Sequence, residues 1–324
     1  MIHQFELPII EAIQNMFISL KPIWMVITNL GTESFYILFM PLIYWCVDAM
    51  MGLRIGVVLL SGGFFNGFFK MLLTSPRPYW MTDKIQAGES HGSFGLPSGH
   101  AMNSAAVWGQ TAIEMKKKWL NWVLGILIFL IGFSRLVLAV HFISDVLLGW
   151  ILAFLLLWLF NRNFPAIWDY LNKASLKKKL LLTVLSSVLM IVLPVLLRLV
   201  FANWQPEAEW LLREPDINPF NLDWAISLSA LWLGMLGGFF VLAHKKGVLQ
   251  SKQGSWQKIV RYLLGLAGVM LLNFGLGAIF PKDLGLLSMV LRFIRYGLIG
   301  LWISAGSPLL FEKLGIGEIR QYQF

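Results

Sequence analysis

The sequence predicts an all-α fold, a polytopic bundle of about nine transmembrane helices. Hydrophobic residues make up 57% of the 324 residues and charged residues only 13%, whereas a soluble domain carries about a quarter charged residues. Apolar runs of roughly 20 residues, enough to cross a bilayer as a helix, recur between short polar connectors. Composition and pattern together indicate an integral membrane protein.

The amino-terminal 30 residues differ from the rest of the chain. Glu6, Glu11 and Lys21 interrupt a moderately apolar segment, so we expect an amphipathic helix at the membrane interface, followed by a turn at Gly31-Thr32. No basic region precedes the apolar residues, as it would in a cleaved signal peptide. Nine apolar spans are expected after it, at 33–51, 53–74, 98–115, 119–140, 143–161, 180–202, 224–243, 257–280 and 285–311.

Lysine and arginine predict how these spans are oriented. One set of connectors carries 16 of the 26 basic residues, and it comprises 52–56, 114–121, 161–179, 244–261 and the tail 312–324. The opposite set is rich in Asp and Glu, and it comprises 75–97, 203–223 and 281–284. The positive-inside rule makes the basic side cytoplasmic. The carboxyl terminus is then inside and the amino terminus outside.

Glycine pairs predict where spans pack closely, and the single cysteine excludes disulfides and cysteine metal sites. Gly234 and Gly238, four residues apart, have the spacing at which two helix backbones approach each other. Cys46 lies in an apolar run, so there is neither a disulfide framework nor a cysteine metal site. The net charge of +9 does not indicate nucleic acid binding, because the basic residues sit in particular connectors, as orientation signals do.

One stretch concentrates ionisable residues in or beside apolar segments. It contains Lys70, Arg77, Pro97-Ser98-Gly99-His100, Ser134-Arg135, His141 and Asp145. Taken singly, each residue has an ordinary explanation, such as an arginine that reaches the membrane interface or a local hydrogen bond. Charge is costly in hydrocarbon, so the combination indicates a functional site.

The residue types suit phosphoryl transfer without a metal ion. The guanidinium groups of Arg77 and Arg135 can each bind two phosphate oxygens, and Lys70 adds a point charge. Ser98 and Gly99 begin a span, where backbone N–H groups are expected to point at an anion.

Two histidines and a carboxylate supply the remaining chemistry. His141 and Asp145 are four residues apart, on one face of a helix, so the carboxylate can accept a hydrogen bond from the imidazole. His100 begins another span and is placed to protonate a leaving group.

The order and spacing of these residues resemble the three-part motif of the type 2 phosphatidic acid phosphatase superfamily. The parts are Lys70-(six residues)-Arg77-Pro78, Pro97-Ser98-Gly99-His100 and Ser134-Arg135-(five residues)-His141-(three residues)-Asp145. This superfamily includes glucose-6-phosphatase, sphingosine-phosphate phosphatases, isoprenoid diphosphatases and vanadium haloperoxidases. The nine-span layout is similar to that of glucose-6-phosphatase and the sphingosine-phosphate phosphatases.

The resemblance implies a role for each residue and an organisation of the chain. It implies that His141 is the nucleophile that forms a phosphohistidine, that Asp145 orients it and that His100 is the general acid. The phosphate is then bound by Lys70, Arg77, Ser98, Gly99 and Arg135. No metal and no other cofactor is implied. The expected domains are an interfacial segment at 1–30, a phosphatase core at 31–162 and a carboxyl-terminal transmembrane extension at 163–324.

The expected reaction is hydrolysis of a phosphomonoester or diphosphate of a lipid. A site at the membrane edge favours an amphiphile that enters from the bilayer, and here it faces the exoplasmic or periplasmic side of a bacterial inner or plasma membrane. A sugar-phosphate phosphatase and a lipid phosphotransferase are the alternatives, and a non-enzymatic scaffold or transporter is the least favoured. Vanadium haloperoxidases are expected to be soluble, so the nine spans argue against that activity.

Other residues have less specific expectations. Arg292 and Arg295 lie three apart on one helical face of the last span, where they either pair with protein groups or contact the substrate. The acidic connector 203–223, with Arg198 or Arg213 as partners for its carboxylates, is expected to form a lid. The expected partners are the lipid phosphate and the bilayer, and a homo-oligomer is compatible with the sequence.

Overall fold

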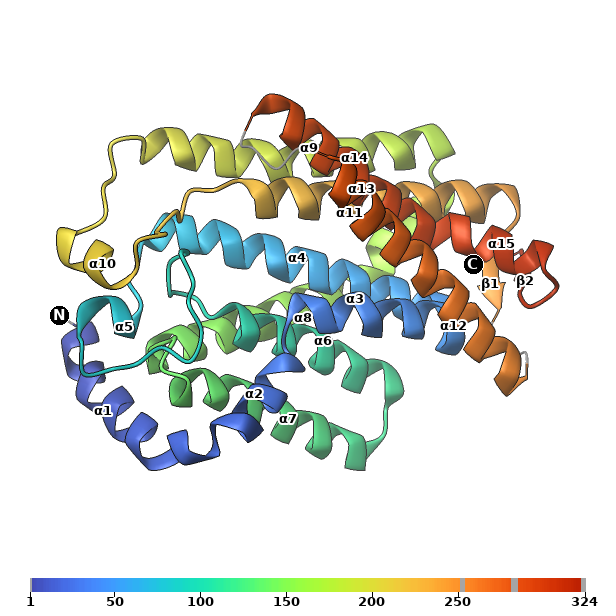
Figure 1. The fold of residues 1–324 in the computed structure, drawn as a ribbon. Coiled ribbons are helices and arrows are strands. Elements are labelled where there is room, and N and C mark those ends of the chain that lie inside the picture. Colours follow the sequence, from blue (N-terminus) through green and yellow to red (C-terminus); the bar gives the residue numbers. More distant parts are fainter. Residues whose placement is uncertain (1, 251–253, 281–284, 322–324) are drawn as a thin grey trace. The chain divides into compact units, whose positions relative to one another are not determined.

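The computed structural model describes residues 2–250, 254–280 and 285–321, and these form a nearly all-helical protein (Figure 1). The chain divides into two compact units. Unit 1 comprises Met1–Tyr36, Ser61–Leu159 and Pro194–Asn221, and unit 2 comprises Ile37–Leu60, Phe160–Leu193 and Leu222–Phe324. The boundary expected at 162 falls inside one continuous helix, α8 (Ile143–Lys173).

Unit 1 carries all three parts of the motif. Its helices are α1 (Ile2–Phe17), α2 (Lys21–Asn29), α5 (Pro78–Met81), α6 (Gly99–Met115), α7 (Lys118–Val137) and α10 (Ala208–Arg213), with parts of α3 (Glu33–Leu42), α4 (Ala49–Leu73), α8 and α9 (Leu176–Val200). Helix α7 packs against α1, α2 and α6. The amino-terminal helices therefore belong to the same compact unit as the motif.

Unit 2 contains most of the carboxyl-terminal half of the chain. Its further elements are α11 (Asp223–Lys245), β1 (Val248–Gln250), α12 (Ser255–Met270), α13 (Leu276–Ile279), α14 (Leu286–Leu301), α15 (Ser307–Lys313) and β2 (Glu318–Arg320). The two short strands pair antiparallel, with Leu249 opposite Ile319. In the part of the chain that the structure describes, three π-helical turns interrupt or join helices, at Ile43–Val47, Leu271–Gly275 and Trp302–Gly306.

Helix ends place the motif residues, and identifiable residues make these ends. Thr74 (φ 46°) follows α4, and Ala139 (φ 53°) lies just after α7. Both adopt the left-handed conformation, which residues other than glycine seldom take, so each turns the chain sharply away from its helix. Ser98 caps α6, because its side chain accepts a hydrogen bond from the backbone N–H of Ala101 at 3.5 Å.

The loop between α5 and α6, residues 82–98, is covered by the segment 194–221. The Phe94 ring packs edge-on against Trp204 and Phe220, with ring centroids 5.0 and 5.6 Å apart. The backbone N–H of Asn218 donates to the carbonyl oxygen of Gly92 at 2.9 Å. Aromatic packing and this hydrogen bond hold the loop beside the motif-bearing helix ends.

The expected count of nine spans is not confirmed. In the part of the chain that the structure describes, seven helical segments are long and apolar enough to cross a membrane, or eight if a bent amino-terminal pair counts as one. They are Ala49–Met81, Lys118–Val137, Ile143–Lys173, Leu176–Val200, Asp223–Lys245, Ser255–Ile279 and Leu286–Lys313.

The predicted spans at 33–51 and 98–115 account for the difference. Helix α6 has only 17 residues, and its polar side chains at Asn103, Ser104 and Gln110 are buried within the protein, where an apolar surface is not required. The segment 33–51 is divided at Asp48, which is extended (φ −160°, ψ 126°). The expected connector 281–284 lies outside the described residues.

Small residues allow α11 and α14 to pack closely, as the glycine spacing predicts. A Cβ atom on Gly234 would lie 2.0 Å from the carbonyl oxygen of Gly297, and one on Gly238 would lie 2.4 Å from the Ser304 hydroxyl oxygen. Both distances are far shorter than a van der Waals contact, so only glycine fits at this interface.

We therefore expect Gly234→Ala to destabilise the protein by about 1–3 kcal/mol, because the added methyl group forces two backbones apart. The measurement is the melting temperature of the detergent-purified protein. Gly237→Ala is the matched control on the same helix, since a Cβ atom there meets nothing within 4 Å. Equal melting temperatures for the two variants would contradict the proposed contact.

Candidate active site

The two cations of the first motif are held by the loop 82–98. Arg77 is buried, and its Nε donates to the carbonyl oxygen of Ser93 at 2.6 Å. Its Nη2 donates to the carbonyl oxygen of Phe94 at 3.2 Å, and the Lys70 ammonium donates to the same oxygen. One main-chain carbonyl therefore fixes both cations.

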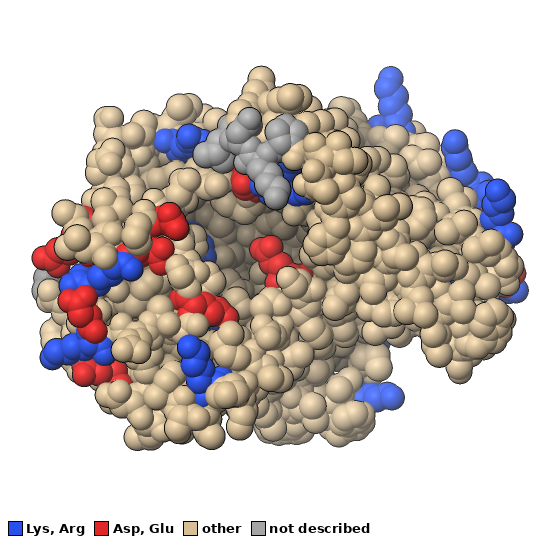
Figure 2. Space-filling model, in the orientation of Figure 1, with Lys and Arg blue, Asp and Glu red and all other residues tan. Residues whose placement is uncertain are grey.

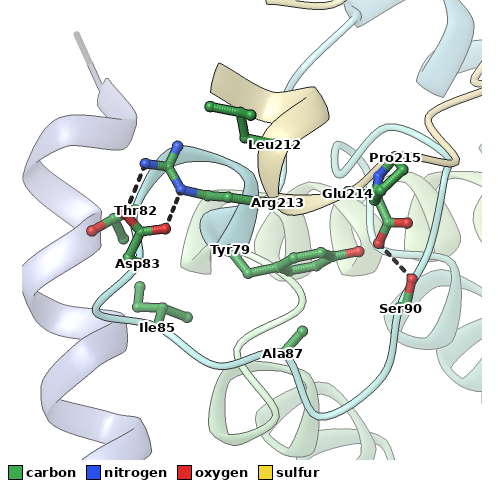
Figure 3. A pocket seen from close by; sticks show the side chains of 10 residues that line it. All are labelled: Tyr79, Thr82, Asp83, Ile85, Ala87, Ser90, Leu212, Arg213, Glu214 and Pro215. Atoms are coloured by element: carbon green, nitrogen blue, oxygen red, sulfur yellow. Dashed lines mark hydrogen bonds and ion pairs between the residues drawn. The ribbon is translucent and has the colours of Figure 1, made fainter. Parts of the chain in front are cut away.

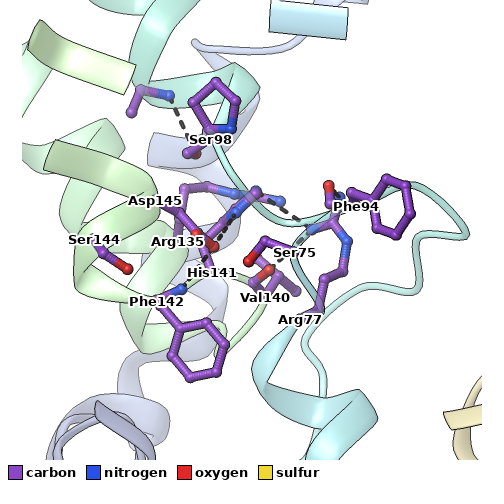
Figure 4. Close-up of polar contacts among 12 residues, drawn as sticks. Ser75, Arg77, Phe94, Ser98, Arg135, Val140, His141, Phe142, Ser144 and Asp145 are labelled. Atoms are coloured by element: carbon purple, nitrogen blue, oxygen red, sulfur yellow. Dashed lines mark hydrogen bonds and ion pairs between the residues drawn. The ribbon is translucent and has the colours of Figure 1, made fainter. Parts of the chain in front are cut away.

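The third motif places a histidine between a carboxylate and Arg77. The Nδ1 atom of His141 lies 3.0 Å from Oδ2 of Asp145, and that oxygen also accepts from the backbone N–H of Phe142 at 2.9 Å. The Nε2 atom of His141 lies 3.3 Å from Nη1 of Arg77 (Figure 4). Because Asp145 binds the proton on Nδ1, Nε2 keeps its lone pair. Burial, followed by the charge of Arg77, holds the pKa of His141 well below its usual value, so this imidazole is neutral at pH 7.

Arg77 also joins the first motif to the third. Its Nη1 donates to the carbonyl oxygen of Val140 at 2.9 Å, directly before His141. Since Ala139 has already turned the chain out of α7, this hydrogen bond fixes the position of the residue that follows it. The orientation of His141 therefore depends on Arg77 as well as on Asp145.

The second motif begins α6, where Ser98 contacts the start of α8. Its backbone N–H donates to the backbone carbonyl of Asp145 at 2.9 Å, so it is not available to an anion. The contact with the first turn of α8 thus uses the backbone donor of Ser98, and phosphate binding by Ser98 stays a prediction. Gly99 is in the first turn of α6, where N–H groups have no acceptor within the helix. The side-chain oxygen of Asn66 lies 3.1 Å from where a Cβ atom of Gly99 would be, so this position is crowded.

Arg135 is fully buried and has partners that lie outside the motif. Its Nη1 donates to the Thr28 hydroxyl at 2.7 Å, and its Nη2 donates to Oε2 of Glu89 at 3.0 Å. Among the described residues, its Nε is buried without a hydrogen-bond partner, as is Nε2 of His100. Two groups that suit a phosphoryl oxygen thus have unused donor or acceptor capacity inside the site.

The structure brings the eight predicted core residues together in unit 1. Lys70, Arg77 and Arg135 lie close enough to interact electrostatically with one another, Lys70 and Arg77 also interact with Asp145, and His100 interacts with Arg135. Three cations, an oriented imidazole and a second imidazole at a helix start can bind a phosphoryl group and provide a nucleophile for it.

Sequence reasoning missed the amino-terminal contributions to the site. The Glu6 carboxylate accepts from both the backbone N–H and the hydroxyl of Ser144, each at 2.8 Å, at the start of α8. The ring of His3 stacks on Phe142 with centroids 4.4 Å apart, and its Nε2 lies 2.9 Å from the Ser75 hydroxyl. These contacts join residues more than 70 positions apart, so no spacing rule reports them.

Glu89 and His91 were also missed, because they appeared only as polar residues of a connector. Hydrogen bonding to His91 is the main cause that lowers the pKa of Glu89 to about 2, and Arg135 lowers it further. Burial lowers the pKa of His91 to about 4. Glu89 is therefore ionised and His91 neutral at pH 7. The Nε2 atom of His91 is 3.2 Å from both Oε2 of Glu89 and Nη2 of Arg135, and a neutral imidazole nitrogen can serve only one of them.

Arg292 and Arg295 belong to unit 2 and are not among the residues gathered in unit 1. Arg292 donates to the carboxylate of Asp223 at 2.7 Å. The guanidinium of Arg295 lies 5.0 Å from the ring centroid of Tyr296. The pairing with Asp223 is the structural alternative expected from the sequence, and substrate contact by either arginine stays a prediction.

A cavity of about 480 Å³ lies between the loop 82–98 and the segment 212–215 (Figure 3). Its walls come from α5, the loop and α10, where Arg213 forms an ion pair with Asp83 at 2.7 Å. Charged side chains of both signs are mixed over this end of unit 1 (Figure 2). The Tyr79 hydroxyl lines the cavity and also binds the backbone of His91, accepting from its N–H at 2.8 Å. The segment around α10 thus pairs its arginine with a carboxylate of the loop.

Comparison with known proteins supports the interpretation of the motif. Residues 51–169 match the PAP2 superfamily, and residues 226–319 match the PAP2 superfamily phosphatase transmembrane extension. Phosphatidylglycerophosphatase B of Bacillus subtilis (strain 168) is 30% identical over 170 residues, which are 46% of this chain and 80% of that protein. The chain belongs to the PAP2 superfamily. This confirms the family that the three-part motif resembles.

Glucose-6-phosphatase 3 is matched over different shares of its length in different organisms, and the rat protein is 24% identical over 341 residues, 95% of this chain and 94% of that protein. Human glucose-6-phosphatase 3 is 30% identical over 182 residues, 48% of this chain and 52% of that protein. The alignment thus spans about half of that relative. The crystal structure of the PAP2-type phosphatidylglycerolphosphate phosphatase from Bacillus subtilis has 27% sequence identity and a TM-score of 0.42, covering 49% of this chain and 86% of that one.

Arg135→Lys keeps the charge but loses the planar group that contacts Thr28 and Glu89, so we expect kcat/KM to fall at least about tenfold. The measurement is phosphate release by purified protein with the preferred substrate. Arg320→Lys is the matched control, because Arg320 is exposed in unit 2. Activity of Arg135→Lys within twofold of the parent protein would contradict a bidentate role for Arg135.

Proposed function

We propose that this protein is an integral membrane phosphatase that hydrolyses a phosphomonoester or diphosphate of a lipid through a phosphohistidine. One observation supports it most directly, the position of His141 between Asp145 and Arg77. With Nδ1 3.0 Å from the carboxylate and Nε2 3.3 Å from a guanidinium, the unprotonated Nε2 lies beside a cation that suits phosphate. An imidazole oriented in this way is an activated nucleophile.

In the first step, Nε2 of His141 attacks phosphorus. A nitrogen–phosphorus bond forms and the ester bond to the leaving oxygen breaks. His100, which binds a proton when the anionic substrate enters the site, gives that proton to the leaving oxygen. Asp145 stabilises the positive charge that His141 gains, while Lys70, Arg77 and Arg135 stabilise charge on the phosphoryl oxygens.

In the second step, water attacks the phosphorus of the phosphohistidine. His100, which lost its proton in the first step, takes one from the water, and the nitrogen–phosphorus bond breaks. Inorganic phosphate leaves and His141 returns to its neutral form. An alcohol in place of water would make the same step a phosphotransfer.

A lipid substrate and an exoplasmic site are supported by sequence similarity and by charge. Phosphatidylglycerophosphatase B, a relative named as a lipid phosphatase, is 30% identical to this chain, and the alignment covers 80% of its length. The lysine-rich connectors, such as 116–118 and 177–179, follow spans at the ends opposite to the motif, which makes the motif side exoplasmic under the positive-inside rule.

A sugar phosphate is the second candidate, and the similarity to human glucose-6-phosphatase 3 favours it. Both substrate classes require the same phosphate-binding residues. They differ in what surrounds the leaving group, which is an acyl chain in one case and a polyol in the other. A substrate panel therefore separates them.

His141→Ala should abolish turnover while the protein still inserts and folds, because the substitution removes the nucleophile. The measurement is phosphate release from phosphatidic acid, a sphingoid-base phosphate, phosphatidylglycerophosphate, undecaprenyl diphosphate and glucose 6-phosphate. His244→Ala, at an exposed position of α11, is the control. Near-normal activity of His141→Ala would overturn the mechanism, and preference for glucose 6-phosphate would favour the second candidate.

Chelation should leave the activity unchanged, since every charge assigned to phosphate binding comes from Lys70, Arg77 and Arg135. Orthovanadate, whose trigonal-bipyramidal adducts resemble the transition state, should inhibit. Both are measured on the preferred substrate, with and without EDTA. An activity that EDTA abolishes and Mg²⁺ restores would count against this mechanism.

A further inference from the structure

Arg135 already has an anionic ligand from the protein. Its Nη2 donates to Oε2 of Glu89 at 3.0 Å, and the guanidinium is completely buried. Carboxylate and phosphate oxygens present the same acceptor chemistry to a guanidinium, and both favour two parallel hydrogen bonds. Glu89 therefore uses a donor that a phosphate bound side-on to Nε and Nη2 of Arg135 would require.

The Glu89 carboxylate and a substrate phosphate repel each other when both lie next to Arg135. Like charges a few ångströms apart repel, most strongly where water is excluded. Glu89 also lies close enough to His100 for an electrostatic interaction. A dianionic phosphate at Arg135 would thus meet an ionised carboxylate at the place where the leaving group must be protonated.

The backbone around Glu89 is fixed, whereas its side chain reaches solvent. The N–H of Gly88 donates to the carbonyl oxygen of Leu138 at 2.8 Å, and the Ser90 hydroxyl donates to the Glu214 carboxylate. The Glu89 side chain itself is 23% exposed. It can therefore rotate away from Arg135 without unfolding the loop that holds it.

We propose that Glu89 is an internal carboxylate ligand of Arg135 that the phosphate group of the substrate displaces. The Nε2 atom of His91, 3.2 Å from Oε2 of Glu89, is placed to donate to that carboxylate when it leaves Arg135. This proposal rests on the proposed function, because the proposed function assigns phosphate binding to Arg135. It also implies that a dianionic phosphomonoester competes for Arg135 better than a monoanionic phosphodiester does.

Two other roles for Glu89 predict different results. If Glu89 only ties the loop to Arg135, its removal loosens the site and weakens the binding of every phosphate-like anion. If Glu89 binds an ammonium or hydroxyl group of the substrate, its removal raises KM for that substrate and leaves vanadate binding unchanged. Removal of an internal competitor tightens anion binding, and so does removal of a fixed negative charge nearby. A variant that keeps the charge but loses the contact with Arg135 separates these two.

The test is Glu89→Gln, which keeps the shape of the side chain and removes its charge. Orthovanadate affinity is measured in full-length, detergent-purified protein from inhibition and from the rise in melting temperature. We expect the inhibition constant to fall about tenfold, equal to about 1.4 kcal/mol, and KM to fall while kcat changes less than twofold. Glu209→Gln, on the exposed surface of α10, should change none of these. An unchanged or weaker vanadate affinity in Glu89→Gln would overturn the proposal.

Glu89→Asp is the second variant, in case the glutamine variant does not fold. It keeps the charge but shortens the side chain, so the contact with Arg135 is lost and vanadate should again bind more tightly. Weaker binding would overturn the proposal here too. Failure of the proposed function is seen separately, as the absence of phosphate release by the parent protein, whereas vanadate affinity by melting temperature does not require turnover.

Discussion

An arginine buried in an apolar bundle needs an acceptor for each of its donors, and this requirement organises the active end of unit 1. Arg77 satisfies it with the carbonyl oxygens of Ser93, Phe94 and Val140. These acceptors come from two separate loops, so one side chain ties the loop 82–98 to the turn that precedes His141. The hydrogen bonds that satisfy the buried guanidinium are thus also the contacts that hold the two loops of the site together.

Local patterns predicted the part of the site that depends on neighbouring residues. The hydrogen bond predicted between His141 and Asp145 is present, but His141 lies in the turn before α8 and not on a helical face with Asp145. The motif residues do lie where helices begin or end. Ser98 caps α6 as its position suggests, but its N–H is used by α8, which no local pattern reports. Among the described residues, seven of the nine predicted spans correspond to helices long and apolar enough to cross a membrane. The predicted spans at 33–51 and 98–115 do not, the first because it is divided at Asp48 and the second because α6 has 17 residues with buried polar side chains.

Contacts between distant residues could not be predicted in this way. Thr28 reaches Arg135 across 107 positions, and Glu6 reaches Ser144 across 138. A single threonine or glutamate in an amphipathic segment has many ordinary explanations, and only the fold shows that these two side chains support the motif. Glu89 is similar, since its place next to Arg135 depends on the path of a loop. The site is therefore larger than the motif that identifies its family.

The loop 82–98 holds the cations of the first motif mainly through its backbone. Ser93 and Phe94 present carbonyl oxygens to Arg77, and Phe94 presents one to Lys70. A carbonyl oxygen is available whatever side chain its residue carries. A change of side chain at 89 or 91 therefore leaves these carbonyl ligands of Arg77 and Lys70 in place. Within a dozen residues, the loop thus combines side chains whose identity the cations do not depend on with backbone carbonyl groups that the cations require.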